Sequence, residues 1–242
     1  VREDNRMIAY LGNWQKCPTT TQLAQYSHVI IAFAVTYRYN PTKNICNPDC
    51  FIDVPPVCNN APNTQLIQDL HRDGKRVILS FGGAGMGGSW HGDVNDCWET
   101  CFGREQQTVD RLVEIVGQLD LDGVDIDYEY FVEDNQRGSG FTKGAEAQTF
   151  LREVTLGLRE KLPTGSILTH APMDIDVTEG TDYFNLLKDV SHTLDFLMPQ
   201  YYNGITRPAA LGFNDGRSNV VPLSGHFNAI VNQFFNGDAT RL

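Results

Sequence analysis

Short apolar runs rich in β-branched residues recur along this chain, with amphipathic stretches or long loops between them. This alternation is typical of repeated βα units that build a parallel sheet. It predicts strands at 7–12, 28–36, 75–82, 122–129, 166–172 and 194–202. Helices are predicted at 62–73, 104–119, 144–161, 182–190 and 224–236. No internal repeat or interdomain linker stands out, so we expect residues 1–242 to form a single α/β domain.

The charge of the chain argues against two classes of partner. Nineteen basic residues, scattered along the sequence, stand against thirty acidic ones, for a net charge of −11. Nucleic acid and anionic membrane are therefore not expected as partners. No apolar run approaches the roughly 18 residues that cross a bilayer. The polar start Val1-Arg-Glu-Asp-Asn lacks the apolar segment of a signal peptide, and beginning at Val rather than Met suggests a processed, secreted chain.

The cysteines point to disulfides. There are six, all in the first half of the chain and without a C-x-x-C pair: Cys17, Cys46, Cys50, Cys58, Cys97 and Cys101. This pattern favours disulfides over a zinc site, with free thiols in a cytosolic protein as the alternative. Six cysteines allow 15 pairings, among which the sequence does not choose. Cys97 with Cys101, and two of Cys46, Cys50 and Cys58, are near enough in sequence to be partners.

The connection from Tyr37 to Asn60 is long, rich in Pro and Asn, and carries three of the cysteines. A loop of this length inside a compact domain needs pinning or has a function. Disulfides would restrict it, and Tyr37 and Tyr39 are candidates for the border of a binding groove.

The strand expected at 122–129 carries the chemistry. Alternate side chains of a strand share a face, so Asp125, Asp127 and Glu129 point one way and Val124, Ile126 and Tyr128 the other. Carboxylates crowded on a buried face cannot all ionise freely, so at least one pKa should be raised, as proton donation near neutral pH requires. The alternatives are a solvated acidic face and a magnesium or calcium site. The apolar neighbours argue against the first, and the lack of acidic ligands at other strand ends argues against the second. We expect no metal and no cofactor.

Three motifs resemble one known family. Asp122-x-x-Asp125-x-Asp127-x-Glu129 resembles the D-x-x-D-x-D-x-E signature of family 18 glycoside hydrolases, the chitinases and related endo-β-N-acetylglucosaminidases. Ser80-Phe-Gly-Gly83 resembles the family's S-x-G-G motif, and Met198-Pro-Gln-Tyr-Tyr-Asn203 resembles its strand with a catalytic Tyr. The opening Tyr10-Leu-Gly-Asn-Trp14 also fits the family's first strand. The resemblance implies a (β/α)8 TIM barrel.

The resemblance also implies a mechanism, retaining hydrolysis without an enzyme nucleophile. Glu129 would protonate the glycosidic oxygen while the substrate's acetamido oxygen attacks the anomeric carbon. Asp127 would orient the acetamido group, and Asp125 would share a proton with Asp127. Tyr202 is the candidate donor to the acetamido carbonyl, with Tyr201 as the alternative if the strand has a bulge.

Further residues are candidates for substrate binding or support: Ser80, Gly82, Met198, Gln200, Tyr130 and Trp90. Ser80 is expected to hydrogen-bond the carboxylates from a neighbouring strand, and Gly82 to let the backbone come close. Asp122 is expected to hold the turn into its strand rather than to touch substrate. A phosphate loop is the alternative for Gly82 to Gly88, but the Lys-Ser/Thr ending of such loops is missing.

The chain departs from the family in its last quarter. Barrels of this kind need about 250 residues, and only about six of the eight βα units are evident here. The seventh and eighth strands, with the Trp usual at the end of the last, have no counterpart in the sequence. Because an open barrel exposes two sheet edges, we expect a C-terminally incomplete domain that a second fragment or subunit closes.

The expected partner is chitin or a chitooligosaccharide, cut by a secreted chitinase. One alternative is an endo-β-N-acetylglucosaminidase acting on N-glycans, which uses the same acidic strand. The other is a non-catalytic chitinase-like sugar-binding protein. Such relatives commonly lose the acid, and Glu129 is present here, which favours catalysis.

Overall fold

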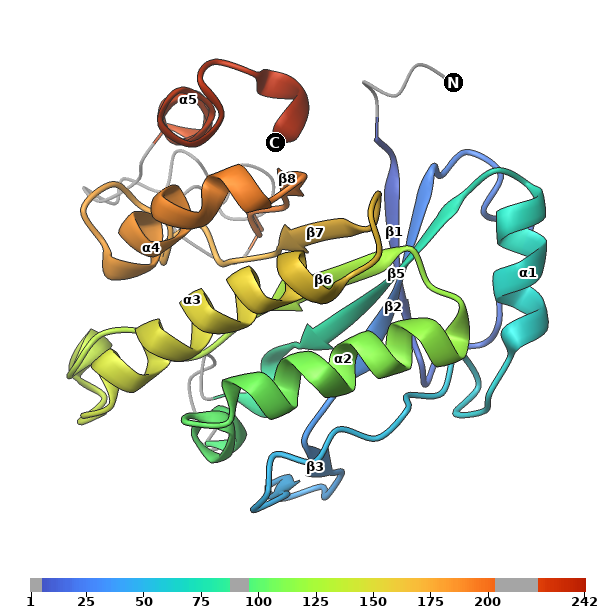
Figure 1. Ribbon diagram of the computed structural model, residues 1–242, viewed down its shortest axis with the longest axis horizontal. Coiled ribbons are helices and arrows are strands. Elements are labelled where there is room, and N and C mark those ends of the chain that lie inside the picture. The colour runs from blue at the N-terminus through green and yellow to red at the C-terminus, as the bar shows by residue number, and fades with distance from the viewer. Residues whose placement is uncertain (1–5, 88–95, 203–221) are drawn as a thin grey trace.

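The computed structural model describes residues 6–87, 96–202 and 222–242 (Figure 1). Six parallel strands form one sheet in the order β1-β2-β5-β6-β7-β8. They are β1 Ile8–Gly12, β2 His28–Ala34, β5 Arg76–Gly82, β6 Gly123–Asp127, β7 Ile167–His170 and β8 Phe196–Leu197. Each range in which the sequence predicts a strand contains one, so the prediction of these six strands is confirmed.

Five α-helices occur in the described part of the chain: α1 Thr64–Arg72, α2 Glu105–Leu119, α3 Gly144–Lys161, α4 Asp182–Val190 and α5 Leu223–Phe235. All lie where the sequence predicts helices, and α3 and α4 have the predicted bounds. In α3, Phe150, Leu151, Val154 and Leu158 are buried, which is the three- and four-residue step of a helix with one apolar face. Short 3-10 helices are η1 Ala84–Met86, η2 Cys97–Cys101, η3 Gln136–Gly138, η4 Ser191–Thr193 and η5 Ala239–Arg241.

The two faces of the sheet differ in chemistry. On the outer face, Val77, Leu79 and Phe81 of β5 belong to the main apolar core, and the helices cover this side of the strands (Figure 1). The inner face has a smaller apolar cluster of Ile30, Ile78 and Phe196, with Ile8, Ile167 and Met198 packed against it. Along β5, Ser80 and Gly82 follow Ile78 on this inner face, toward the carboxyl end of the strand. The interior is therefore apolar at one end and polar at the end where βα loops leave the sheet.

The described strands make a partial barrel with β1 at one edge and β8 at the other. Near the opening, the guanidinium of Arg6 lies 4.3 Å from the ring centroid of Phe196 and donates to the carbonyl of Thr240. Residues close to the described N-terminal and C-terminal ends therefore meet beside β8. The arrangement fits the predicted TIM barrel, of which the described residues form six parallel strands.

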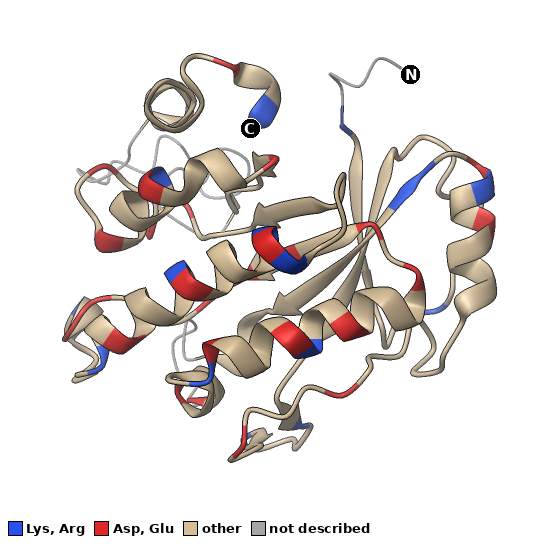
Figure 2. Ribbon diagram, in the orientation of Figure 1, with Lys and Arg blue, Asp and Glu red and all other residues tan. Residues whose placement is uncertain are grey.

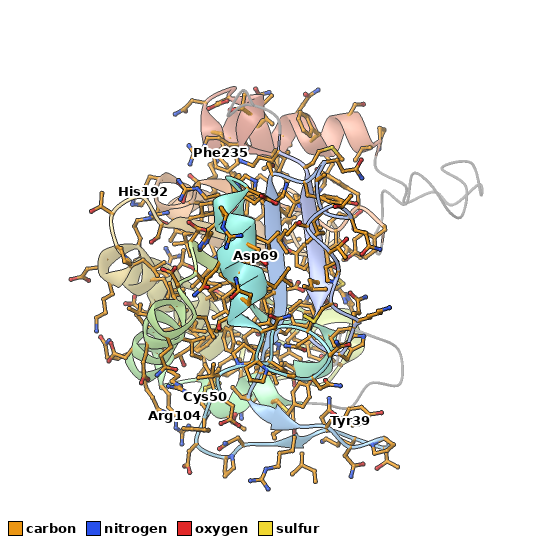
Figure 3. All side chains as sticks on the ribbon, turned by 90° about the vertical axis from the view of Figure 1, so that its right-hand side faces the viewer. Tyr39, Cys50, Asp69, Arg104, His192 and Phe235 are labelled. Atoms are coloured by element: carbon orange, nitrogen blue, oxygen red, sulfur yellow. A yellow bond between two sulfur atoms is a disulfide. The ribbon has the colours of Figure 1, made fainter. Side chains whose placement is uncertain are left out.

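The long connection after β2 forms an insertion, residues 37–61, that contains a two-stranded antiparallel sheet, β3 Tyr37–Arg38 and β4 Ile45–Cys46. Figure 3 shows Tyr39 and Cys50 at the lower end of the molecule. Three disulfides hold the insertion, Cys17–Cys58, Cys46–Cys97 and Cys50–Cys101. The predicted pinning of this loop is confirmed.

The predicted disulfide partners are wrong. Cys97 and Cys101 do not pair with each other, nor do any two of Cys46, Cys50 and Cys58. Cys97 and Cys101 are the ends of η2, where four residues at about 2.0 Å rise separate Cα atoms by roughly 8 Å, beyond the reach of a disulfide. Each therefore bonds the residue 51 positions earlier on the insertion that lies beside it.

Acidic and basic residues are interspersed along the helices and loops (Figure 2), as the scattered charges of the sequence predict. Within the described ranges, no helix combines the length and the apolar character needed to span a membrane.

Candidate active site

A row of carboxylates lies at the carboxyl end of β6, inside the partial barrel. Asp125 pairs in register with Ser80 of β5, and Asp127 with Gly82. Asp125, Asp127 and Glu129 are 0%, 4% and 5% exposed, so the strand removes three acidic groups almost completely from water. Tyr128 points the opposite way and packs on Trp98, with ring centroids 4.6 Å apart. The alternation expected from the sequence is therefore present.

Asp125 is held by one residue of the neighbouring strand β5 and by one residue of the distant strand β1. Its Oδ2 accepts hydrogen bonds from the hydroxyl of Ser80 at 2.7 Å and from the hydroxyl of Tyr10 at 2.9 Å. Its Oδ1 is buried and has no hydrogen-bond partner among the described residues. Burial raises the pKa of Asp125 to about 7, against the lowering effect of the two hydrogen bonds. The group therefore changes its protonation near neutral pH.

Asp127 lies between two other carboxyl groups. Burial raises the pKa of Asp127 well above its usual value, and the charges of Glu129 and Asp125 raise it further. A hydrogen bond from Gln200 opposes these effects. Because a negative charge on Asp127 is disfavoured from both sides, the neutral acid is the form that this environment stabilises.

Gln200 joins the carboxylates to the next strand. Its Nε2 lies 2.8 Å from Oδ1 of Asp127, 3.2 Å from Oε1 of Glu129 and 3.0 Å from the carbonyl oxygen of Ala171. An amide nitrogen has two hydrogens, so these three acceptors share them. Gln200 thus binds one oxygen of Asp127 and one oxygen of Glu129.

The two tyrosines after Gln200, Tyr201 and Tyr202, have different surroundings. Tyr202 is 70% exposed, and partial burial together with the charges of Asp127, Glu129 and Asp125 raises the pKa of its hydroxyl to about 12. Tyr201 instead packs against α5, where its hydroxyl is 3.4 Å from Nδ1 of His226. Of the two candidates, Tyr202 is the one near the carboxylates.

Ser80, Gly82 and Met198 lie around the carboxylates with different contacts. Ser80 has no exposed surface, so it can hold Asp125 by its hydrogen bond but cannot contact a ligand. Gly82 has φ +121°, and a Cβ there would stand 2.3 Å from the carbonyl oxygen of Asp127. Met198 places its sulfur 3.9 Å from the hydroxyl of Tyr10.

Three other residues lie away from the inner face or outside the described ranges. Tyr130 is 7% exposed and donates a 2.7 Å hydrogen bond to Glu99, which leaves little of its ring for a sugar. Trp90 lies outside the described residues. Asp122 holds the turn before β6, as expected, by accepting a 2.7 Å hydrogen bond from the backbone N–H of Val77.

Sequence reasoning did not assign a role to Tyr10. Its hydroxyl bonds Asp125 across the barrel from β1, more than a hundred residues away in sequence. The alternation of side chains along β1 could have indicated this role. Ile8 and Tyr10 share the inner face of β1, as Asp125 and Asp127 share the inner face of β6. Only the curvature of the sheet brings the two faces together.

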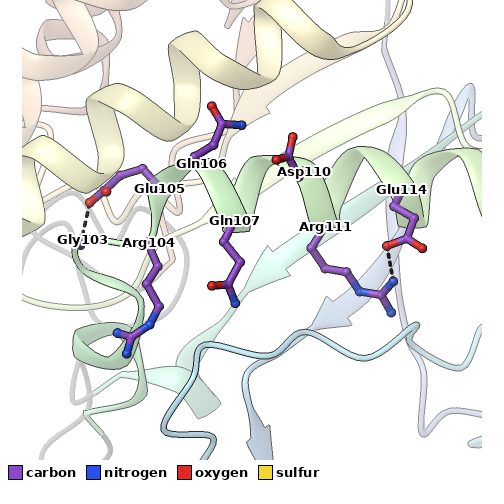
Figure 4. A pocket seen from close by; sticks show the side chains of 8 residues that line it. All are labelled: Gly103, Arg104, Glu105, Gln106, Gln107, Asp110, Arg111 and Glu114. Carbon is purple, nitrogen blue, oxygen red and sulfur yellow. Dashed lines mark hydrogen bonds and ion pairs between the residues drawn. The ribbon is translucent and has the colours of Figure 1, made fainter.

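A separate hollow of about 650 Å³ runs along the outer side of α2 (Figure 4). Its lining mixes both signs of charge, with an ion pair of 2.5 Å between Arg111 and Glu114. This surface is unlike the buried carboxylate row, from which the sheet separates it. Among the described residues, no group of three or more His, Cys, Asp or Glu side chains is placed to hold a metal ion.

Comparison with known proteins agrees with this geometry. The family description "Glycosyl hydrolases family 18" matches residues 6–230. Chitinase 1 of Tulipa saxatilis subsp. bakeri is 30% identical over 182 residues, covering 72% of this chain and 51% of that protein. The chain thus spans about half the length of this curated relative.

Solved structures share the fold. A GH18 chitinase from Pseudoalteromonas aurantia matches with a TM-score of 0.62 and 25% identity, covering 83% of this chain and 69% of that one. A mutant GH18 chitinase from Cycas revoluta in complex with (GlcNAc)4 matches with a TM-score of 0.57 and 16% identity, covering 95% and 64%. With the family match extending over nearly the whole sequence, the chain belongs to glycosyl hydrolases family 18.

Proposed function

We propose that this chain hydrolyses β-1,4 bonds between N-acetylglucosamine units of chitin or chitooligosaccharides, with Glu129 as general acid and base. The observation that carries the proposal is the buried row of Asp125, Asp127 and Glu129, cross-linked by Gln200 and supported by Ser80 and Tyr10. Burial raises the pKa values of Asp125 and Asp127, and proton donation to a leaving sugar near neutral pH requires carboxyl groups in such an environment.

In the proposed reaction, Glu129 donates its proton to the glycosidic oxygen as the bond to the anomeric carbon breaks. The acetamido oxygen of the same sugar attacks that carbon and forms an oxazolinium ion. Glu129, now a carboxylate, takes a proton from water as the water opens this ring, which restores the acid and retains the configuration. No enzyme nucleophile is needed.

The neighbours prepare the substrate's acetamido group. With the shared proton on Asp125, Asp127 is a carboxylate that accepts a hydrogen bond from the acetamido N–H and stabilises the positive charge that develops on the ring. Asp125 shares a proton with Asp127 through its buried Oδ1, which has no partner among the described residues. Tyr202 donates to the acetamido carbonyl from the exposed side.

The disulfides bear on where this reaction takes place. Three of them tie the insertion to the barrel, and disulfides persist in oxidising compartments. We propose a secreted protein on this ground.

The test is cleavage of chitohexaose by wild type and by Glu129→Gln, followed by separation of the products. The variant keeps the shape of the side chain but has no proton to donate, so we expect a loss in kcat of about 10²–10⁴-fold. Glu153→Gln, at an exposed position on α3, is the matched control and should keep the wild-type rate.

Two outcomes would overturn the proposal. A glycopeptide with an N-glycan core cut faster than chitohexaose would identify an endo-β-N-acetylglucosaminidase. Binding of chitohexaose by the wild type without any cleavage would identify a sugar-binding protein.

A further inference from the structure

Glu129 lies beyond the part of β6 that the sheet holds. The pairing of β6 with β5 ends at Asp127, and its pairing with β7 ends at Ile126. Glu129 follows two residues after Asp127, so its backbone is outside the ladders of the sheet. A catalytic group displaced by about 1 Å can lose roughly 10² in rate. Contacts beyond the ladders therefore decide where the carboxyl group of Glu129 stands.

Tyr130, the next residue, is anchored by its ring and by its hydroxyl. The ring is 7% exposed and packs on Phe131 and Phe141, with centroids 5.0 Å and 5.5 Å away. The hydroxyl donates a 2.7 Å hydrogen bond to Oε1 of Glu99. Burial, this hydrogen bond and the charge of Glu99 raise the pKa of Tyr130, so the hydroxyl keeps its proton and remains the donor.

Glu99 also binds the far end of the same loop. Its Oε2 accepts a 2.6 Å hydrogen bond from the ammonium of Lys143, and Lys143 is the N-cap residue of α3. One carboxylate thus joins both ends of the connection between β6 and α3. An isolated surface ion pair contributes little, but the side chain of Glu99 is only 23% exposed, and its two partners close a loop that begins beside Glu129.

The short helix that carries Glu99 is itself held in place. Glu99 is the middle residue of η2, and two disulfides attach the ends of η2 to the insertion. Between these ends, Trp98 is fully buried, and its ring centroid lies 4.6 Å from that of Tyr128. η2 therefore contacts the residues on both sides of Glu129, through Trp98 on Tyr128 and through Glu99 on Tyr130.

The turn after β5 packs against the same peptide. A Cβ on Gly87 would stand 2.3 Å from the carbonyl oxygen of Glu129 and 3.0 Å from the ring of Tyr130. The insertion contacts this turn as well, because Nδ2 of Asn44 donates a 2.9 Å hydrogen bond to the carbonyl of Gly85. The backbone of Glu129 is thus packed against Gly87, while the residue after it is bonded to Glu99.

We propose that Glu99 is a positioning residue for Glu129 and acts through the hydroxyl of Tyr130. The inference rests on the proposed function, because it concerns how the acid of that reaction is oriented. It also gives the insertion a role, since two of its disulfides hold the helix from which Glu99 reaches Tyr130.

The experiment measures kcat and KM for chitohexaose with Glu99→Ala, with Tyr130→Phe and with the double variant. We expect each single variant to lower kcat about tenfold, because a hydrogen bond to a charged group is lost. KM should stay unchanged, since the substituted groups hold the acid and not the substrate. The double variant should lose no more than either single one, because both substitutions break the same bond.

A second substrate separates positioning of the acid from a general loosening of the site. In 4-nitrophenyl β-chitotrioside the leaving group is a nitrophenolate, which departs with little help from a proton donor. If Glu99 orients the acid, the same variants should lower kcat/KM for this substrate by less than about threefold. A general loosening would lower the rates with both substrates equally.

Glu114→Ala is the matched control, since Glu114 also forms a short ion pair, 2.5 Å from Arg111, but on α2 away from the carboxylates. It should keep the wild-type kcat. Tyr130→Phe leaves the buried ring in place, so it tests the hydroxyl without removing packing. A melting curve for each variant verifies that the fold is intact.

Four results would overturn the inference: wild-type kcat in both single variants, losses that multiply in the double variant, equal losses with the two substrates, or the same loss in Glu114→Ala. In each of these the wild type still cleaves chitohexaose, so the proposed function stands. A wild type that cleaves neither substrate would overturn the proposed function and the inference with it.

Discussion

At the residue scale, the carboxyl groups of the site differ in the hydrogen-bond donors around them. Asp125 receives two hydrogen bonds on one oxygen, while Asp127 and Glu129 share the amide of Gln200. All three groups are buried, yet the donors to Asp125 differ from the donor that Asp127 and Glu129 share. This difference lets one strand carry groups with distinct roles, because the donors around a carboxyl group decide how readily it ionises.

A consequence is a pH-dependent stability. The pKa of Asp125 is about 7 in the folded chain and about 3.9 in an unfolded one. Between these values the folded state holds a proton that the unfolded state has released, so the contribution of Asp125 to stability is fully present below about pH 4 and is lost as the pH rises toward 7. Asp125→Asn cannot ionise and should lose less stability across this window.

Thermal melting of wild type and Asp125→Asn at pH 4 and pH 8 checks this expectation. Asp53→Asn, at an exposed position, is the control and should follow the wild type. Parallel curves for wild type and Asp125→Asn would contradict the buried titration. On activity, we expect the same substitution to shift the pH profile, since the Asp125–Asp127 pair is broken.

At the element scale, the contact between β5 and the end of β6 positions the row of carboxylates. Gly82, the last residue of β5, lies so close to β6 that a Cβ would stand 2.3 Å from the carbonyl oxygen of Asp127 and 2.5 Å from the ring of Trp98. Its backbone also has a φ of +121°, which side chains rarely adopt. Glycine is therefore required there by both space and conformation.

Gly82→Ala should lower the free energy of unfolding by about 3 kcal/mol or more, combining backbone strain with a clash in a packed site. Gly165→Ala is the matched control. Gly165 also has a positive φ, +89°, but nothing lies within 4 Å of its added Cβ. It should cost only about 1–2 kcal/mol. Urea denaturation measures both, and equal losses would show that the close approach to Asp127 is unimportant.

At the scale of the whole molecule, the sheet has two open edges. In the part of the chain that the structure describes, β1 pairs only with β2 and β8 only with β7. Between them lies a hollow of about 550 Å³ bordered by Ile8, Phe196 and Met198, so part of the apolar interior adjoins the opening. Unpaired strand edges are templates for pairing with another chain.

We therefore expect residues 1–242 alone to associate with increasing concentration, or to bind a second polypeptide that completes the barrel. Sedimentation velocity over a wide concentration range measures this. A single stable species of 27.1 kDa at every concentration would contradict the expectation.

The order of the elements and the residues of the acidic row follow from the sequence alone. Hydrophobic alternation is a local property, so strands, helices and the common face of Asp125, Asp127 and Glu129 can be predicted from neighbouring residues. The bounds of α3 and α4 agree with the prediction for the same reason.

Only the tertiary structure decided which distant segments meet. The bonds from Tyr10 to Asp125 and from Gln200 to Asp127 join strands 115 and 73 residues apart, and the disulfides of η2 join segments 51 residues apart. Tyr130, a groove candidate by sequence, turned out to lie in an aromatic cluster on Phe141. Such contacts depend on how the sheet curves and how the loops pack, which no local pattern of residues specifies.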